Sequence, residues 1–415
     1  MEKDVRNTQL LNYQSLLENL VPENSHLLLG NGFNLSLGIN TSYNEIFSRM
    51  KELSPDYNLL EEKFKNANSD IEWVIGNLQN SINNENNYKG FLDHFITNKI
   101  TADFMKATMS IVLENIKNIY QEKNDGIYLL LCKFQNYFTV NYDPFLYLLL
   151  MKLKKKDDQA IVSANNIKLL ENDDSELFKL IDTAYQEAKL TINYQDKVIN
   201  GNLKNITKSD FSNQVIKIIK NQYPNTTVKK IEKNINTFFR NLKPDNRTLE
   251  INDGFQGELF NDDCTNSKQN VFFIHGGFHI YQSGKKIKKI TQTNEKALYQ
   301  NIDDIIDAED KDIVCILKPD NKLDDIEQNN YLKKSLYKLS EIEGELVIFG
   351  SALSENDNHI FHRINDNKKI TTVYISTFPE RLEQTSKRAL EVFPNKVIRY
   401  FDYKTVSYVN TDTGN

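Results

Sequence analysis

Short apolar runs, each stopping at a small or polar residue, recur along the chain. Most of them are continuously apolar rather than alternating, which is typical of strands buried on both faces of a parallel sheet. Segments with helical spacing of apolar residues lie between them, for example at 145–153 and 331–339. This alternation predicts an α/β fold with a Rossmann-like, doubly wound parallel sheet. The predicted strands are 26–29, 137–140, 271–274, 313–317, 346–349, 372–375 and 397–400.

Two stretches interrupt the alternation and are predicted to be helical. Residues 59–118 carry apolar side chains at helical spacing, as at Ile71, Val74 and Leu78. Residues 157–245 are rich in Lys, Asn and Asp, again with helical spacing, as at Phe211, Val215 and Ile219. The predicted division is a sheet domain built from 1–58, 119–156 and 246–415, a helical segment at 59–118 and a helical insertion at 157–245. Within the last part, the polar, glycine-containing stretch 251–270 is predicted to be a loop or an active-site lid.

Charge and composition narrow the classes of function. The chain has 415 residues and a net charge of −6, so it has no general electrostatic reason to bind nucleic acid. We interpret the Lys-rich runs 152–156 and 285–289 as solvated faces. No apolar run approaches the roughly 20 residues of a membrane helix, and the first residues, MEKDVRNTQL, lack the apolar stretch of a signal peptide. We therefore expect a cytoplasmic protein with no membrane contact.

The three cysteines, Cys132, Cys264 and Cys315, are widely spaced and form no CxxC pair. A disulfide framework is therefore not expected, and a four-cysteine zinc site within one chain is excluded.

Candidate chemistry gathers just after the predicted strands. Ligands of open parallel sheets bind outside the carboxyl ends of the strands, so the residues just after each predicted strand are the candidates for binding and catalysis. They are Gly30, Asn31, Gly32 and Phe33 after the first run, Asn141 and Asp143 after the second, His275 after the third, and Gly350 and Ser351 after the fifth.

Each glycine turn has two interpretations. The glycines of Gly30-Asn31-Gly32-Phe33 would let backbone N–H groups approach a pyrophosphate, but the third glycine of the Rossmann pattern is missing, and a tight strand-to-helix turn explains the sequence equally well. Ser351 could donate to a phosphate or a ribose, or could belong to a structural turn. Asp357 follows Ser354 by three residues, and we interpret it as a helix-capping residue.

The polar residues at the other strand ends are also weighed against structural roles. Asn141 can orient a water molecule or a ribose hydroxyl, whereas Asp143, before Pro144, fits a helix N-cap. His275 is the candidate general base, because histidine titrates near neutral pH; the alternative is a buried histidine bonded to a backbone carbonyl. His359 and His362 share one helix face, which we expect to be a solvent or interface face rather than a metal site.

Taken in order, these segments resemble the SIR2 (sirtuin) family. That family has a Gly-Ala-Gly turn, a Thr-Gln-Asn-x-Asp segment, a His-Gly segment and a Gly-Ser/Thr-Ser turn. At the corresponding positions, in the same order, the chain has Gly30-Asn31-Gly32, Thr139-Val140-Asn141-Tyr142-Asp143, His275-Gly276 and Gly350-Ser351-Ala352. The motifs Asn-Tyr-Asp, Ile-His-Gly and Gly-Ser-x-Leu-x-x-Asn-Asp-x-His-Ile look most like those of the divergent bacterial group labelled DUF4917. Many SIR2-like proteins of this kind belong to anti-phage defence systems.

The departures from the sirtuin pattern argue against a protein deacylase. The zinc cysteines are missing, and Val140 stands where sirtuins have Gln. The resemblance then implies an NAD+ hydrolase that takes NAD as its substrate, needs no metal, and uses Asn141, His275 and Asp143 in its chemistry. Gly30 to Phe33 with Gly350 and Ser351 would bind the dinucleotide. It also implies an NAD-depleting defence effector that forms homo-oligomers and responds to a partner such as a HerA-type ATPase.

Two other functions remain open at this point. The fold could sense NAD, ADP-ribose or a related nucleotide and regulate a defence complex without turnover. The second of these functions is that of a nuclease or a scaffold of a defence complex. A nuclease should have clustered metal-binding carboxylates. We interpret the acidic pairs in 303–310 and 324–325 as solvated faces instead.

Overall fold

The computed structural model falls into two compact units, Met1–Leu148 with Ile251–Asn415, and Leu149–Glu250. The central sheet and the candidate site belong to the first unit. The structure describes residues 10–82, 89–122, 124–163, 181–182, 189–194, 197–202, 249, 251–261, 268–291, 294–308, 310–318 and 321–408, with a few positions between 216 and 229.

Seven parallel strands form the central sheet, in the order β1-β15-β14-β13-β2-β3-β9. After the edge strand β1, the chain enters the middle of the sheet at β2, adds β3 and β9 on one side, and returns to β13 on the other side before adding β14 and β15. This is the strand order of a Rossmann-like doubly wound sheet, so the predicted fold class is confirmed. The strands are β1 (Leu10–Leu11), β2 (Ser25–Leu29), β3 (Asn136–Thr139), β9 (Val271–Phe273), β13 (Gly344–Phe349), β14 (Ile370–Thr377) and β15 (Val397–Asp402).

The register of the inner strands brings their carboxyl ends level. All residues of β2, β3 and β9 are buried, as their apolar sequences predict. Leu29 lies opposite both Phe349 and Thr139, and Thr139 lies opposite Phe273. Four strands therefore end at the same height, and the residues that follow them meet at one edge of the sheet.

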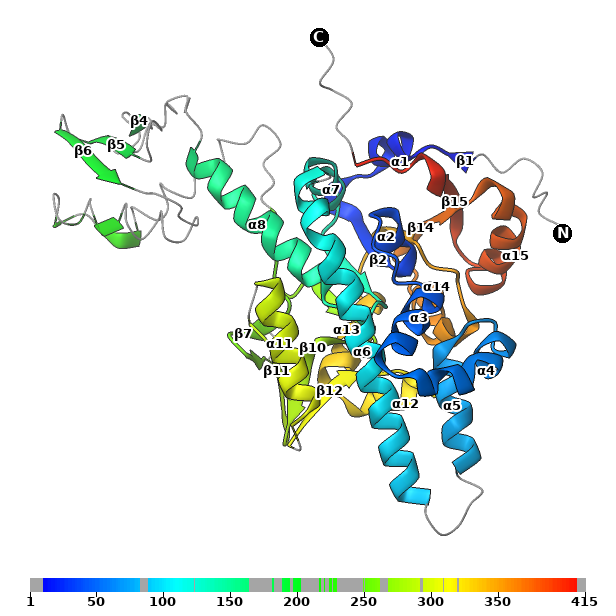
Figure 1. Cartoon of the computed structure of the whole chain (residues 1–415). Coiled ribbons are helices and arrows are strands. Elements are labelled where there is room, and N and C mark those ends of the chain that lie inside the picture. The colour runs from blue at the N-terminus through cyan, green and yellow to red at the C-terminus, as the bar shows by residue number, and fades with distance from the viewer. Residues whose placement is uncertain are drawn as a thin grey trace. The chain divides into compact units, whose positions relative to one another are not determined.

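Helices pack on and beside the sheet (Figure 1). In its described residues, the predicted helical segment 59–118 holds the end of η3 (Pro55–Leu60), α4 (Glu61–Asn66), α5 (Ile71–Ile82) and most of α6 (Lys89–Glu122), and α6 packs against α3, α5 and α11. Asp70 begins α5 by accepting the backbone N–H groups of Glu72 and Trp73. The other helices are α1 (Tyr13–Asn19), α2 (Asn31–Ser36), α3 (Tyr43–Leu53), α7 (Asn124–Leu131), α8 (Phe145–Ser163), α11 (Glu295–Ile306), α12 (Lys322–Gln328), α13 (Asn330–Tyr337), α14 (Asn358–Asp366) and α15 (Leu382–Val392).

A second, antiparallel sheet corrects two sequence predictions. Its order is β12-β10-β11-β8-β7. The run at 313–317 was predicted in the parallel sheet but belongs here, and the predicted loop or lid at 251–270 contains β7 and β8. Only two residues separate β9 from β10, too few for the crossover that a parallel neighbour needs, so the chain turns into a different sheet. The strands are β7 (Phe255–Gln256), β8 (Leu259–Phe260), β10 (Gly276–Ser283), β11 (Lys286–Lys289) and β12 (Lys311–Cys315).

Lys289, at the end of the Lys-rich run 285–289, is not on a solvated face. Its side chain is only 10% exposed and is paired with the carboxylate of Asp253. The ammonium group also lies 5.0 Å from the ring centroid of Tyr147 and 5.4 Å from that of Phe255. The prediction was wrong for Lys289, because β11 turns this residue toward the interior while Lys286 points outward.

The insertion at 157–245 is not wholly helical in the part that the structure describes. It holds the end of α8 and an antiparallel sheet of β4 (Ile181–Asp182), β5 (Lys189–Tyr194) and β6 (Lys197–Asn202). Alternating polar and apolar residues on either side of a two-residue connection favour a hairpin there. The pattern at Phe211, Val215 and Ile219 lies outside the described residues.

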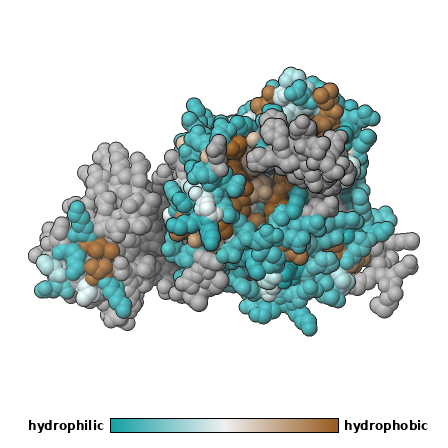
Figure 2. Space-filling model, turned by 90° about the horizontal axis from the view of Figure 1, so that it is seen from below, coloured by the Kyte–Doolittle hydropathy of each residue, from teal (hydrophilic) through white to brown (hydrophobic). Residues whose placement is uncertain are grey.

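No helix among the described residues is long and apolar enough to cross a membrane. The face shown in Figure 2 is mostly hydrophilic, with apolar residues gathered in separate patches.

Candidate active site

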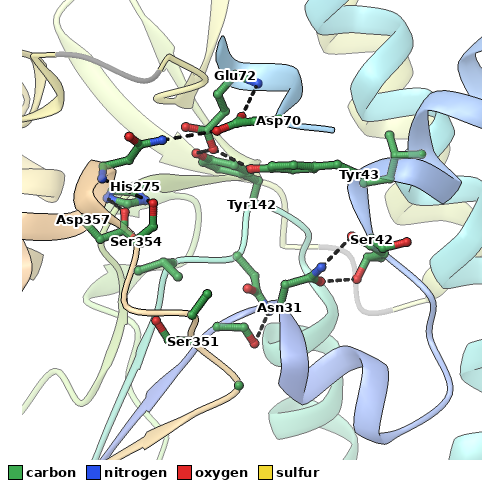
Figure 3. Close-up of a pocket in the computed structure, with 18 of the residues that line it drawn as sticks. Asn31, Ser42, Tyr43, Asp70, Glu72, Tyr142, His275, Ser351, Ser354 and Asp357 are labelled. Carbon is green, nitrogen blue, oxygen red and sulfur yellow. Dashed lines mark hydrogen bonds and ion pairs between the residues drawn. The ribbon is translucent and has the colours of Figure 1, made fainter. Parts of the chain in front are cut away.

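A cavity of about 600 Å³ opens at the level carboxyl ends of the inner strands (Figure 3). Most of the residues predicted from the strand ends line it together, although they are far apart in the sequence. They are Gly30, Asn31, Asn141, Asp143, His275, Gly350 and Ser351. Gly32 and Phe33 are not among the lining residues, so the structure brings together seven of the nine predicted positions.

The two glycine turns pack backbone against backbone. The amide of Gly32 donates to the carbonyl oxygen of Gly350 at 2.8 Å. A Cβ on Gly32 would lie 2.5 Å from the Gly350 Cα, and a Cβ on Gly30 would lie 2.7 Å from the Gly350 oxygen. Gly350 has φ +75°, a conformation that favours glycine. Contact between the turns after β2 and β13 therefore accounts for all three glycines without a ligand.

This contact also consumes most of the amides expected to hold a pyrophosphate. The Gly30 amide donates to Phe349, the Gly32 amide to Gly350, and the Phe33 amide to Gly30. The ring of Phe33 is buried and packs against Phe349. Gly30 and Asn31 of this turn line the cavity, but the side chain of Asn31 is bonded to Thr41: it donates to the Thr41 carbonyl at 2.8 Å and accepts from the Thr41 hydroxyl at 2.5 Å. The predicted pyrophosphate-binding segment Gly30 to Phe33 is therefore reduced to Asn31, because the tight turn and the sheet already use the amides of the other three residues.

Ser351 and Arg381 stand on the wall formed by the second glycine turn and η6 (Pro379–Arg381). The Ser351 hydroxyl oxygen accepts the Leu353 amide at 3.1 Å, which leaves its proton free to be donated. Arg381 is exposed, and it and Lys322 are the two Lys or Arg residues among those that line the cavity. This side of the cavity is therefore the one suited to an anionic group.

Asn141 and Asp143 have different surroundings. The Asn141 amide group donates weakly to the oxygens of Gly30 and Asn34, at 3.4 and 3.3 Å, and its side-chain oxygen is left for a ligand. Asp143 is buried and accepts hydrogen bonds from the Asn34 side chain and the Phe145 amide, both at 2.9 Å. Burial raises its pKa, although these hydrogen bonds act in the opposite direction. Asp143 therefore caps the start of α8, which is the structural role that its sequence position before Pro144 favoured. It also holds Asn34 beside Asn141.

His275 lies in the turn between β9 and β10, with 1% of its surface exposed. Its Nε2 atom is 3.0 Å from Nε2 of His359 and 3.8 Å from a carboxylate oxygen of Asp357. Burial, with the charge of Lys322 and then His359, lowers the pKa of His275 well below its usual value. The imidazole is therefore neutral at pH 7, the form that can accept a proton.

Asp357 and His359 correct the sequence interpretation of the segment after Gly350. Asp357 does not cap α14 with its side chain; the Ser354 hydroxyl accepts the Asn356 amide instead. The carboxylate of Asp357 faces the cavity near His275 (Figure 3). His359 faces His275 rather than solvent, whereas His362 on the same helix is exposed. The two histidines lie one helical turn apart on α14, and the contact with His275 covers only the first of them.

A buried ion pair that the sequence did not indicate completes the cavity floor. Lys322, at the start of α12, and Glu72, in α5, are each 4% exposed, and their charged groups are 2.8 Å apart. The hydroxyls of Tyr43 and Tyr142 donate to the other oxygen of Glu72, at 2.6 and 2.7 Å (Figure 3). Lys322 also approaches Asp357 at 3.7 Å. This group of Glu72, Lys322 and Asp357 is called the charge triad below.

The charge triad shifts the proton affinity of its members. Burial alone would lower the pKa of Lys322, but Glu72 and Asp357 outweigh it and raise that pKa, so the ammonium stays charged. Burial raises the pKa of Asp357 to about 6; Lys322 opposes this rise and Glu72 adds to it. With Asp70, the cavity floor has three carboxyl groups and one lysine. This excess of carboxyl groups suits a positively charged group above the floor.

Asp357 should make stability depend on pH in a defined direction. Because its folded pKa of about 6 exceeds its usual 3.8, the folded state binds the extra proton and gains stability as pH falls from about 6.5 to 4. Asp357→Asn removes this gain, so the difference in unfolding free energy between wild type and variant should change by on the order of 1–3 kcal/mol across that range. Urea unfolding at several pH values measures it.

Asp304→Asn, which removes an exposed carboxylate on α11, is the matched control and should give a curve parallel to that of the wild type. Parallel curves for Asp357→Asn as well would contradict the raised pKa.

Residues 245–408 match the family model described as a domain of unknown function, DUF4917. This bears out the predicted DUF4917 resemblance for that segment, which carries His275, Lys322, Gly350, Asp357 and His359. The other wall of the cavity, with Asn31, Glu72 and Asn141, precedes the match. No curated protein matches the chain.

Among the described residues there is no group of three or more His, Cys, Asp or Glu side chains arranged to hold a metal ion. The acidic residues proposed for a nuclease do not cluster there: Asp303 pairs with Lys106 at 2.9 Å, and Asp325 with Lys318 at 2.6 Å.

Proposed function

We propose that this protein is an NAD+ glycohydrolase that splits NAD+ into nicotinamide and ADP-ribose. One observation supports this most strongly: Asn141 and His275, the residues for which the SIR2 resemblance implies chemistry, line one cavity at the strand ends. Ligands of doubly wound sheets bind at the point where the strand order reverses, and here that point lies between β2 and β13.

The charges of the cavity fit the two ends of this substrate. The pyrophosphate is anionic and suits the side with Ser351 and Arg381. The nicotinamide ring is cationic, and the sugar becomes cationic as the bond to nicotinamide breaks. Both suit the carboxylate-rich floor around Glu72 and Asp357, because a fixed negative field stabilises positive charge that develops in the transition state.

In the proposed mechanism, each residue acts through an atom that the fold leaves available. The side-chain oxygen of Asn141 orients the ribose or the attacking water. The neutral imidazole of His275 accepts a proton from a ribose hydroxyl or from that water. Asp143 supports the cavity wall: it holds Asn34, which in turn contacts Asn141.

The direct test is release of nicotinamide from NAD+ by the purified chain. Replacing His275 by alanine should lower the rate roughly 10²–10⁴-fold, the usual contribution of general-base catalysis. Asn141→Ala should lower it as well, and His362→Ala, an exposed position on α14, should leave it unchanged. Full activity in both Asn141→Ala and His275→Ala would refute the assignment. Binding of NAD+ without release, even with a genomic partner present, would favour the sensor function instead.

The proposed biological role is depletion of NAD+ in a bacterial anti-phage defence system. It rests on the SIR2 and DUF4917 resemblance. An enzyme that destroys free NAD+ must be held inactive until needed, so we propose control by self-assembly or by a partner such as a HerA-type ATPase. Phage challenge of cells carrying the wild type or His275→Ala, with NAD+ measured over time, tests this role.

A further inference from the structure

The two facing imidazoles of His275 and His359 impose a condition on their protons. Their Nε2 atoms are 3.0 Å apart, a hydrogen-bond distance. Neutral histidine carries one proton on one nitrogen and a lone pair on the other. A hydrogen bond between two neutral rings therefore needs the proton on one Nε2 and the lone pair on the other.

The surroundings of His359 decide which ring donates. Burial lowers the pKa of His359 to about 4, and the backbone carbonyl of Asn356 acts in the opposite direction by favouring a proton on this ring. Because Nε2 of His359 faces His275, a proton that this carbonyl favours on the ring of His359 belongs on Nδ1. A neutral His359 with its proton on Nδ1 has a lone pair on Nε2, so it must accept from His275.

The carboxylate of Asp357 favours the same arrangement. Its oxygen lies 3.8 Å from Nε2 of His275, and a negative charge there stabilises an N–H bond directed toward it. The second nitrogen of His275, Nδ1, has no hydrogen bond from the described residues, and His275 lines the cavity.

We propose that His359 and Asp357 are positioning residues that hold His275 in the tautomer protonated on Nε2, so that Nδ1 is the nitrogen that accepts a proton in the cavity. The tautomer follows from the contacts of the folded chain alone; the task of Nδ1 as a base rests on the proposed function. The arrangement follows the general logic in which a base is oriented by a third group, which fixes the tautomer and the ring direction.

Every element packed around His275 contributes to its charge state. Lys322 from α12 and His359 from α14 disfavour the imidazolium, and burial does so more strongly. Asp357 from η5 (Glu355–Asp357) favours the Nε2 proton, and the ring of Tyr142 stacks on the imidazole with centroids 6.2 Å apart. Lys322 is shared between Glu72 and Asp357, so the charge triad keeps Asp357 in place.

Nitrogen NMR of the full chain labelled selectively at histidine tests the tautomer without any substrate. The His275 signals are assigned by their loss in His275→Gln. At pH 7 we expect a protonated Nε2 and an unprotonated Nδ1. His359→Leu removes the acceptor and should produce a mixture of both tautomers, and Asp357→Asn should shift the balance in the same direction. His359→Gln, which keeps a carbonyl acceptor, should retain the wild-type signals, as should the exposed control His362→Gln.

Nicotinamide release by the same variants supplies the second readout. His359→Leu should lower the rate by about 10-fold or more, because a catalytic histidine in the wrong tautomer cannot act as the base, and His359→Gln should restore most of it. A wild-type His275 protonated on Nδ1, or an unchanged tautomer in His359→Leu, would overturn the proposal. If the tautomer is as expected and the wild type releases no nicotinamide even with its genomic partner present, the inference stands and the proposed function fails.

Discussion

Replacing Lys322 by methionine should lower the free energy of unfolding by about 3–5 kcal/mol, because removing one partner of a buried ion pair leaves the other charge uncompensated. Lys322 is 4% exposed and neutralises two carboxylates, those of Glu72 and Asp357. Methionine fills a similar volume, so the loss would report the missing charge rather than a cavity. Urea unfolding followed by circular dichroism at pH 7 measures the change.

Lys338→Met is the matched control, because Lys338 pairs with Glu341 at 3.0 Å on the surface. Exposed pairs contribute about 0–1 kcal/mol, so the control should unfold almost as the wild type does. The double variant Lys322→Met with Glu72→Gln should recover part of the lost stability, since the two residues interact directly. A loss below about 1 kcal/mol for Lys322→Met would mean that Glu72 and Asp357 are solvated or protonated in the folded protein.

Gly350→Ala should destabilise the fold by roughly 3–5 kcal/mol, placing it among the most damaging single changes. Two costs combine. The φ of +75° is unfavourable for alanine, and the added Cβ would lie 2.4 Å from the Phe33 amide nitrogen and 2.5 Å from the Gly32 carbonyl carbon. Both neighbours are backbone atoms at the start of α2 and cannot move as a flexible side chain would.

Gly284→Ala separates the two costs. Gly284 has φ +60°, and a Cβ there would have no atom within 4 Å, so this variant carries the conformational cost alone, about 1 kcal/mol. Thermal or urea unfolding of both variants gives the difference, which reports the contact between the two turns. Equal losses would show that the turns after β2 and β13 separate easily.

The strand ends could be predicted from the sequence because each rests on a local signal. A continuously apolar run, such as 26–29 or 271–274, marks a buried strand, and parallel strands of one sheet end at the same edge. That reasoning led to Asn141 and His275, which share the cavity. It could not decide between the two roles of Gly30 and Gly32, since a phosphate cradle and a backbone contact require the same small residue.

The charge triad had no such signal. Glu72 and Lys322 lie in helices 250 residues apart, and a charged residue near a helix start is ordinary in sequence. Their burial depends on how α5 and α12 approach the sheet, which no periodicity reveals. Asp357 and His359 were visible as part of a motif, but their partner His275 follows β9, three strands away from β13 in the sheet. Only the sheet order makes these residues neighbours.

The order of the parallel sheet also bears on how the protein can be divided. Strands β2 and β3 lie between β13 and β9, and both come from outside the 245–408 segment that matches DUF4917. A fragment limited to that segment would lose both of these strands, leaving β13 with an unpaired, apolar edge and β9 with no partner in this sheet. Open edges of this kind are templates for aggregation. The matched segment is therefore one part of an interleaved fold, and its boundaries are unsuitable places to cut the chain.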